Sequence, residues 1–178
     1  ASEVTIVVDA ADEDKVQIVL DGVSITNSDF PAIYVKNADK VFVTTTDSEN
    51  ELSVTGEFVE ASDGTNTDAV IYSKDDLVIN GLGTLTITST DNGISVKDDL
   101  KITGGTLNIT CEDAALEVKD LIAIADGDIT IVTKNDGIHA ENDNDDSDGN
   151  VYICGGTINI ECGDDAVHAT AIIQIDDG

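Results

Sequence analysis

The chain contains no arginine, methionine or tryptophan, and it has one proline and 8 lysines in 178 residues. Its 37 aspartates and glutamates therefore leave a formal net charge of −29. Recognition of phosphate depends on clustered lysine and arginine, so this scarcity excludes nucleic acid as a partner. No apolar run approaches the roughly 20 residues that a membrane-spanning helix needs, and we expect no membrane span.

Aromatic and sulfur-containing residues are also scarce. The 3 tyrosines and 3 phenylalanines are too few to favour a flat aromatic platform for neutral glycans. The cysteines, Cys111, Cys154 and Cys162, are odd in number, which excludes a complete disulfide framework. We expect them to act as small buried hydrophobes.

Apolar residues are abundant, at 40% of the chain, so the sequence is not a disordered acidic tail. Its length favours one domain over residues 1–178. The chain begins at Ala1 without an initiator methionine, as a processed segment does. We therefore expect a secreted, extracellular or cell-surface protein that lacks the terminal rungs of a longer chain.

A repeat organises the sequence. A glycine followed by an alternating apolar segment recurs at Gly83, Gly105 and Gly127, which lie 22 residues apart, and again at Gly156 after 29 residues. The longer interval carries an acidic insertion at residues 141–149. A fixed period of this length is typical of a solenoid, in which each repeat forms one turn, or rung.

Each repeat contains three short runs with apolar residues at every second position, separated by glycine or aspartate turns. In one rung these runs centre on Lys101, Asn108 and Glu117. Alternation with a period of two predicts strands, and no segment has the 3.6-residue period of a helix. The sequence therefore predicts an all-β fold, a right-handed parallel β-helix of about eight rungs that is about 40 Å long.

The third strand of each rung places a distinctive row of polar side chains on the outside of the predicted solenoid. The row has tyrosines near one end, lysines along the middle, and His139 and His168 at the other end, where we expect exposed, unliganded imidazoles. Lysines supply point charges, and tyrosine rings can stack on sugars. The candidate carbohydrate-binding residues are Tyr34, Tyr72, Lys74, Lys97 and Lys119.

Acidic residues stand at both ends of these third strands. Carboxylates one rung apart repel each other by about 1 kcal/mol per pair in water, and 8 lysines cannot neutralise 37 acids. Ca²⁺ takes about six to eight oxygen ligands and relieves this repulsion, so we expect Ca²⁺ as a cofactor. The candidate metal ligands are Asp75, Asp76, Asp91, Asp98, Asp99, Asp113, Asp120, Asp136, Glu141, Asn142, Asp143, Asp164 and Asp165.

The Lys-Asp-Asp and Asp-Asn-Gly-Ile motifs in residues 69–77 and 91–100, and the related segments 136–143 and 163–169, resemble those of a known family. It is a bacterial family of secreted, calcium-binding, carbohydrate-binding β-helix proteins that bind cellulose and pectin and are distantly similar to β-helical pectate lyases. The resemblance implies a right-handed parallel β-helix. It also implies metal roles for the aspartates of these motifs.

Three functions remain open from the sequence. The favoured one is non-enzymatic, calcium-dependent binding of a cell-wall polysaccharide, most naturally an acidic, polygalacturonate-like chain, with cellulose as the other glycan. The second is a calcium-dependent pectate lyase in which Lys97 or Lys119 acts as the base. The third is a structural protein that associates end to end through the unpaired edges of its terminal rungs.

Overall fold

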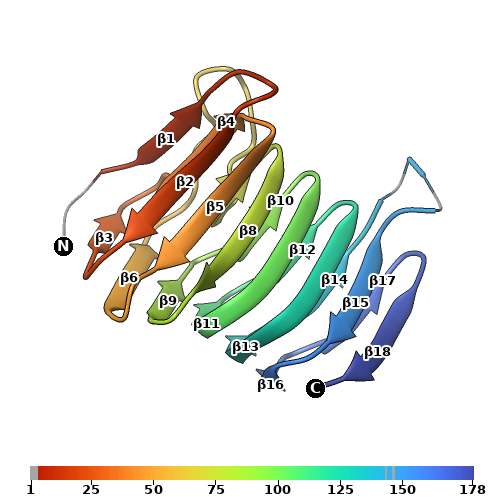
Figure 1. The fold of residues 1–178 in the computed structure, drawn as a ribbon. Coiled ribbons are helices and arrows are strands. Elements are labelled where there is room, and N and C mark those ends of the chain that lie inside the picture. Colours follow the sequence, from red (N-terminus) through yellow and green to blue (C-terminus); the bar gives the residue numbers. More distant parts are fainter. Residues whose placement is uncertain (1–3, 143, 146) are drawn as a thin grey trace.

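The computed structural model describes residues 4–142, 144–145 and 147–178, and these form a parallel β-solenoid that winds from β1 at one end to β18 at the other (Figure 1). The strands are β1 (Ile6–Asp9), β2 (Lys15–Leu20), β3 (Ser24–Asn27), β4 (Ile33–Asn37), β5 (Lys40–Thr45), β6 (Glu49–Val54), β7 (Ala69–Ser73), β8 (Asp76–Gly81), β9 (Thr84–Thr88), β10 (Asn92–Val96), β11 (Asp99–Cys111), β12 (Leu116–Val118), β13 (Leu121–Thr133), β14 (Ile138–Ala140), β15 (Asn150–Cys154), β16 (Thr157–Glu161), β17 (Val167–Ala169) and β18 (Ile173–Asp177). The predicted all-β, parallel solenoid is confirmed.

One sheet contains the third strand of every rung, in the order β1-β4-β7-β10-β12-β14-β17. We call it the third-strand sheet. Its 7 strands correspond to about seven turns among the described residues, close to the roughly eight that the sequence predicted. One long connection, residues 55–68, joins β6 to β7.

The first and second strands of a rung merge in the middle of the solenoid. β11 and β13 each run for 13 residues through a bend, where the sequence predicted two separate short strands. The bend falls at glycine, because Gly105 has a φ of 89° and Gly127 a φ of 127°. Residues with a side chain are strained in this region, so glycine lets one strand continue around the corner.

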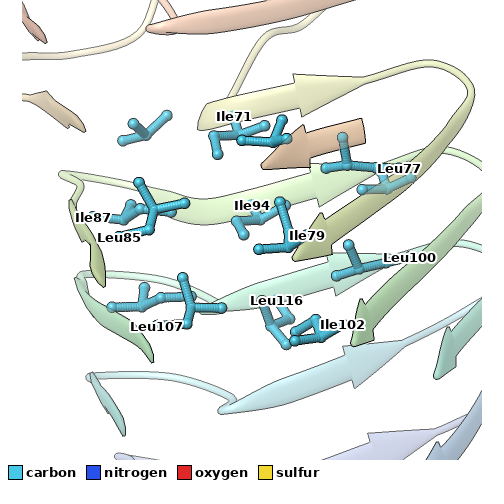
Figure 2. Close-up of a cluster of buried hydrophobic side chains, with 14 of the residues drawn as sticks. Ile71, Leu77, Ile79, Leu85, Ile87, Ile94, Leu100, Ile102, Leu107 and Leu116 are labelled. Atoms are coloured by element: carbon cyan, nitrogen blue, oxygen red, sulfur yellow. The ribbon is translucent and has the colours of Figure 1, made fainter. Parts of the chain in front are cut away.

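Stacked apolar side chains fill the interior (Figure 2). The register aligns Leu85, Leu107, Ile129 and Ile158 in one inward column, as the alternation predicted. The first three are at most 2% exposed, whereas Ile158 near the last rung is only partly buried. A continuous core thus forms from equivalent positions of successive rungs.

All three cysteines are free, and Cys111 is buried while Cys154 and Cys162 are partly exposed. The expectation of an incomplete disulfide framework is confirmed, and that of full burial holds for Cys111 alone. Within the described part of the chain, no helix is present that could cross a membrane.

Candidate functional site

The outer surface of the third-strand sheet presents one side chain per rung in a straight column. The register aligns, in order, Tyr34, Tyr72, Ser95, Glu117, His139 and His168. Two residues further along each strand stands a second column, which contains Lys36, Lys74, Lys97, Lys119 and Glu141. The face predicted from sequence is therefore formed, and its two columns run along the solenoid axis.

The two tyrosines do not lie on the accessible surface. Tyr34 is 3% exposed and Tyr72 is 4% exposed, and they form a small cluster with Ala61 and Phe30. Ala61 belongs to the connection of residues 55–68, which lies over this end of the sheet (Figure 1). The expectation that the rings stack on a sugar is therefore wrong, because the chain itself covers them.

Each candidate lysine is held by a carboxylate. Lys74 Nζ lies 3.2 Å from Asp63 Oδ2, and Lys119 Nζ lies 3.7 Å from Asp120 Oδ1. Lys97 Nζ donates to Glu117 Oε1 at 3.1 Å and lies 5.5 Å from the centre of the Tyr72 ring. These ammonium groups are partly exposed on the outer face, and each positive charge is balanced by the carboxylate that it contacts.

Two adjoining hollows form a polar groove over β10, β12 and β14. One hollow has a volume of about 250 Å³ and the other about 440 Å³. They share Glu117, His139 and Glu141, so they form one continuous depression across the outer columns. The smaller hollow includes Lys119, which follows the end of β12. The larger hollow includes Asp91, which precedes the start of β10.

Three aspartates converge where the third strands end. Ligand oxygens of Asp76, Asp98 and Asp99 lie within 4.8 Å of one another, and we call these residues the aspartate trio. Burial, followed by repulsion from Asp76 and Asp99, raises the pKa of Asp98 to about 6. Lys40 Nζ lies 2.9 Å from Asp76 Oδ2 and Lys101 Nζ lies 4.0 Å from Asp99 Oδ2, so two lysines offset part of the charge of three carboxylates. The trio therefore has a deficit of positive charge and the donor set that a hard cation takes.

A second group of three acids lies where the third strands begin. Asp136, Asp164 and Asp165 also place ligand oxygens within 4.8 Å of one another. Asp136 is 6% exposed, and its Oδ2 lies 2.6 Å from His139 Nδ1. His139 thus already contacts one oxygen of this group, as Lys40 and Lys101 do in the aspartate trio.

The sequence predicted exposed histidines that bind no metal, and the His139 side chain is only 20% exposed. His139 Nε2 lies 2.9 Å from Glu141 Oε2, so both ring nitrogens contact carboxylates. The His139 and His168 rings stack with centroids 4.6 Å apart and an interplanar angle of 12°. His139 is therefore a structural element of the groove wall, and the expectation of an exposed imidazole is wrong for it.

The other candidate ligands do not join either acidic group within the described residues. Asp75 Oδ2 accepts a hydrogen bond from the Ala38 amide at 3.0 Å. Asp113 Oδ1 accepts one from Asn135 at 2.5 Å, and Asp120 Oδ1 accepts one from Asn142 at 2.7 Å. The remaining candidates divide as follows: Asp91 and Glu141 line the groove, and Asp143 lies outside the described residues.

Several groove residues were not predicted as candidates. The larger hollow is lined by Asp68, Asn92 and Glu117. Ser95 lies next to Glu117 in the outer column of the sheet. Asn92 carried a detectable signal, because the neighbouring rungs have alanine at its position, Ala69 by register. The alternation of apolar residues shows only which side chains face inward, so it does not tell which of the outward polar residues line a groove.

Raised pKa values predict an unusual dependence of stability on pH. Burial, followed by repulsion from Asp68 and Asp113, raises the pKa of Asp91 to about 6, as in Asp98. A carboxyl group whose pKa is higher in the folded chain than in the unfolded chain binds its proton more tightly in the folded state. Its contribution to stability is therefore complete at a pH below the pKa of the unfolded chain, and it is lost as the pH rises through the pKa of the folded chain. The pKa of His139 is also raised, because hydrogen bonds to its carboxylates outweigh burial, and it acts in the same direction.

We therefore expect the melting temperature in chelator-containing buffer to fall as pH rises from about 5 to about 7.5. Thermal unfolding followed by circular dichroism measures this trend. The Asp91→Asn/Asp98→Asn variant should flatten it, because an amide does not titrate. A profile that rises over the same interval, or that is unchanged in the variant, contradicts the prediction.

The chain is similar to known proteins along its whole length. The profile of a family described as "Carbohydrate-binding domain-containing protein" matches residues 1–178. A protein of the same description from Acetivibrio thermocellus is 46% identical over 173 residues, which cover 96% of this chain and 60% of that protein. The chain thus spans about 60% of the length of this relative.

A solved structure has the same fold. It is described as the polysaccharide lyase-like protein from C. thermocellum, in a gadolinium derivative. It matches with a TM-score of 0.84 and 33% sequence identity, over 97% of this chain and 80% of that chain. The similarity therefore extends along nearly the whole solenoid.

Proposed function

The chain belongs to the family of carbohydrate-binding domain-containing proteins, and on this basis we propose that it binds an acidic cell-wall polysaccharide through calcium ions held at its aspartate corners. The supporting observation is the position of the aspartate trio beside the polar groove. Asp98 and Asp99 directly follow Lys97, which lines the groove. A cation at the trio is thus close to the part of the groove that Lys97 and Lys119 line.

The trio fits calcium by its chemistry. Asp76, Asp98 and Asp99 offer only carboxylate oxygens, the ligands that hard cations prefer, and their ligand atoms already converge. Burial, followed by repulsion from Asp76 and Asp99, raises the pKa of Asp98, and a cation at the trio would offset that repulsion. When bound, calcium supplies the positive charge that a second carboxylate, from a uronic acid, requires as a partner.

The net charge explains why an ion is needed. A protein with a charge of −29 repels a polyanion, and its few lysines are already paired with carboxylates. Local reversal of sign at the trio lets the sugar carboxylates approach, while Lys97 and Lys119 orient the chain along the axis. The proposed polymer lies in cell walls, so the proposal places the protein outside the cell.

Cleavage is the second candidate, because the similar solved structure is described as polysaccharide lyase-like. A lyase needs a general base with a free lone pair next to the reacting proton. Lys97 and Lys119 are the bases the sequence offered, and both ammonium groups contact carboxylates in the structure. Binding without cleavage therefore accounts better for this surface.

Binding to polygalacturonate with graded methyl esterification tests the proposal. Titration calorimetry with calcium should show binding that weakens as esterification rises, because the ester removes the charge that the ion recognises. An excess of chelator should abolish binding. Equal binding of esterified and free polymer contradicts the ion-bridge mechanism, and ultraviolet absorbance from an unsaturated product in the same samples shows a lyase instead.

A further inference from the structure

The long connection between β6 and β7 lies across the outer face of the third-strand sheet, at one end of the polar groove. We call residues 55–68 the strap. In the next rung, residues 89–91 alone make the equivalent connection, from β9 to β10. The strap lies over the rungs of β4 and β7 (Figure 1). The extra residues are therefore concentrated on the face that carries the groove.

Contacts hold the strap from one edge of the sheet to the other. The Val59 amide donates to the carbonyl of Asp29, in the connection that leads into β4, at 3.0 Å. Ala61 then packs against the tyrosine rings of the first outer column. Beyond the rings, Asp63 Oδ2 accepts a hydrogen bond at 3.2 Å from Lys74 Nζ, in the second outer column. The strap therefore crosses both columns.

Hydrogen bonds within the strap close its tip into a turn. The Ala61 amide donates to the Thr65 carbonyl at 2.9 Å, and the Thr65 hydroxyl donates to Asp63 Oδ1 at 2.6 Å. The Tyr34 hydroxyl donates to Asp63 Oδ2 at 3.4 Å, so one carboxylate joins the tip to the ring beneath it. Displacing the strap would expose the apolar parts of the buried rings, so it is a stable part of the fold.

The groove begins where the strap ends. Asn66 and Asp68, at the end of the strap, line the larger hollow. Lys97 lines the smaller hollow, and its Nζ lies 5.5 Å from the centre of the covered Tyr72 ring. Both hollows extend from there to His139, in the rung of β14. The strap is therefore a wall across one end of the groove.

The opposite end of the groove has no such wall in the part of the chain that the structure describes. The first outer column continues from His139 to His168, in the last third strand, β17. The His168 side chain is 39% exposed, and that of Asp165 beside it is 64% exposed. A polymer that lies along the solenoid axis can therefore leave the groove at this end, whereas the strap blocks its path at the other.

The aspartate trio lies close to the walled end. Asp76 follows Lys74 by two positions, and Lys74 holds the tip of the strap. Asp98 directly follows Lys97, which lies beside the covered ring. A sugar carboxylate bound at the trio would therefore belong to the sugar unit nearest to the strap.

We infer that the groove binds the terminus of an acidic polysaccharide chain, with the last sugar unit against the strap, and does not bind the middle of a chain. This inference rests on the proposed polymer binding and names the part of the polymer that is recognised. A polymer that lay parallel to the strands would pass beside the strap, and its middle would then bind. The two arrangements predict different numbers of protein molecules per chain.

Calorimetry in calcium with a short and a longer soluble fraction of polygalacturonate measures this number. With polymer concentration expressed as chains, the wild type should bind one molecule per chain in both fractions, because each chain has one terminus of a given kind. Binding to the middle of the chain would instead give a number that rises in proportion to length.

Chains with altered termini provide a second measurement. Fragments cut by a pectate lyase and then reduced with borohydride carry an unsaturated sugar at one end and an opened ring at the other. Fragments of the same length from acid hydrolysis keep both native ends and serve as the reference. The wild type should bind the altered fragments at least about tenfold more weakly, because the hydrogen bonds to the native terminal sugar are lost.

Replacing residues 55–68 with a copy of residues 89–91 removes the wall with a connection that the chain already uses. Circular dichroism checks that this variant folds, and its number of molecules per chain should then rise with polymer length. The matched control is Glu57→Gln/Glu60→Gln, which changes exposed positions of the strap and keeps its course. The control should still bind one molecule per chain.

Each contrary result has a distinct meaning. If the wild type binds more molecules on longer chains, or binds altered and native termini equally, the inference is wrong while the proposed function stands. A folded strap-replacement variant that still binds one molecule per chain contradicts the strap as the wall. If the wild type binds neither fraction, the proposed function itself fails.

Discussion

Replacing Asp98 and Asp99 together with asparagine is expected to abolish calcium-dependent binding to polygalacturonate and to invert the effect of calcium on stability. In chelator, the variant should melt at a higher temperature than the wild type, because mutual repulsion within the aspartate trio disappears. In saturating calcium, the wild type should melt higher. An ion at a hundredfold excess over its Kd stabilises the folded state by about 2.7 kcal/mol, and the variant lacks this gain.

Thermal unfolding with and without calcium measures this crossover, and calorimetry with the polymer measures binding. The matched control is Asp126→Asn/Asp128→Asn, which removes the same charge from exposed positions around the Gly127 bend. It should retain polymer binding and the calcium-induced rise in melting temperature. A trio variant that binds the polymer as tightly as this control would exclude the trio as the calcium site.

Truncating Leu100 to alanine is expected to destabilise the solenoid by about 2–5 kcal/mol. Leu100 is fully buried and stacks between Leu77 and Ile122 of the neighbouring rungs. Its removal leaves a cavity that two flanking rungs cannot close, because their backbone spacing is held by the parallel hydrogen bonds. For a chain of this length, the melting temperature should fall by about 5–15 °C.

Urea unfolding at fixed calcium concentration measures this loss. Leu82→Ala is the control, because Leu82 is 83% exposed at a turn and its truncation should change stability by no more than about 0.5 kcal/mol. Leu100→Met keeps most of the volume and should cost less than about 1.5 kcal/mol. Equal losses for the Leu100→Ala and Leu82→Ala variants would contradict the stacked-core interpretation.

The positions of the acidic residues along the strands could be predicted from the sequence, but their contacts with one another could not. The repeat predicted that aspartates gather at both ends of the third strands, and they do. It did not predict that Asp76 meets Asp98 and Asp99 whereas Asp75 turns to the Ala38 amide. These neighbours differ by one position in the chain, and the local corner conformation alone decides which carboxylate converges with the next rung.

The sequence by itself determined the parallel solenoid and its inward columns, because side-chain direction in a strand follows a local period of two and identical rungs repeat it. Leu85, Leu107 and Ile129 could be assigned to the core on that basis alone. Only the tertiary structure decided what covers or joins the outward positions. Residues 55–68 bury the tyrosine rings, and Asp68, Asn92 and Ser95 come together across rungs, because such contacts depend on loop paths and register between segments distant in the chain.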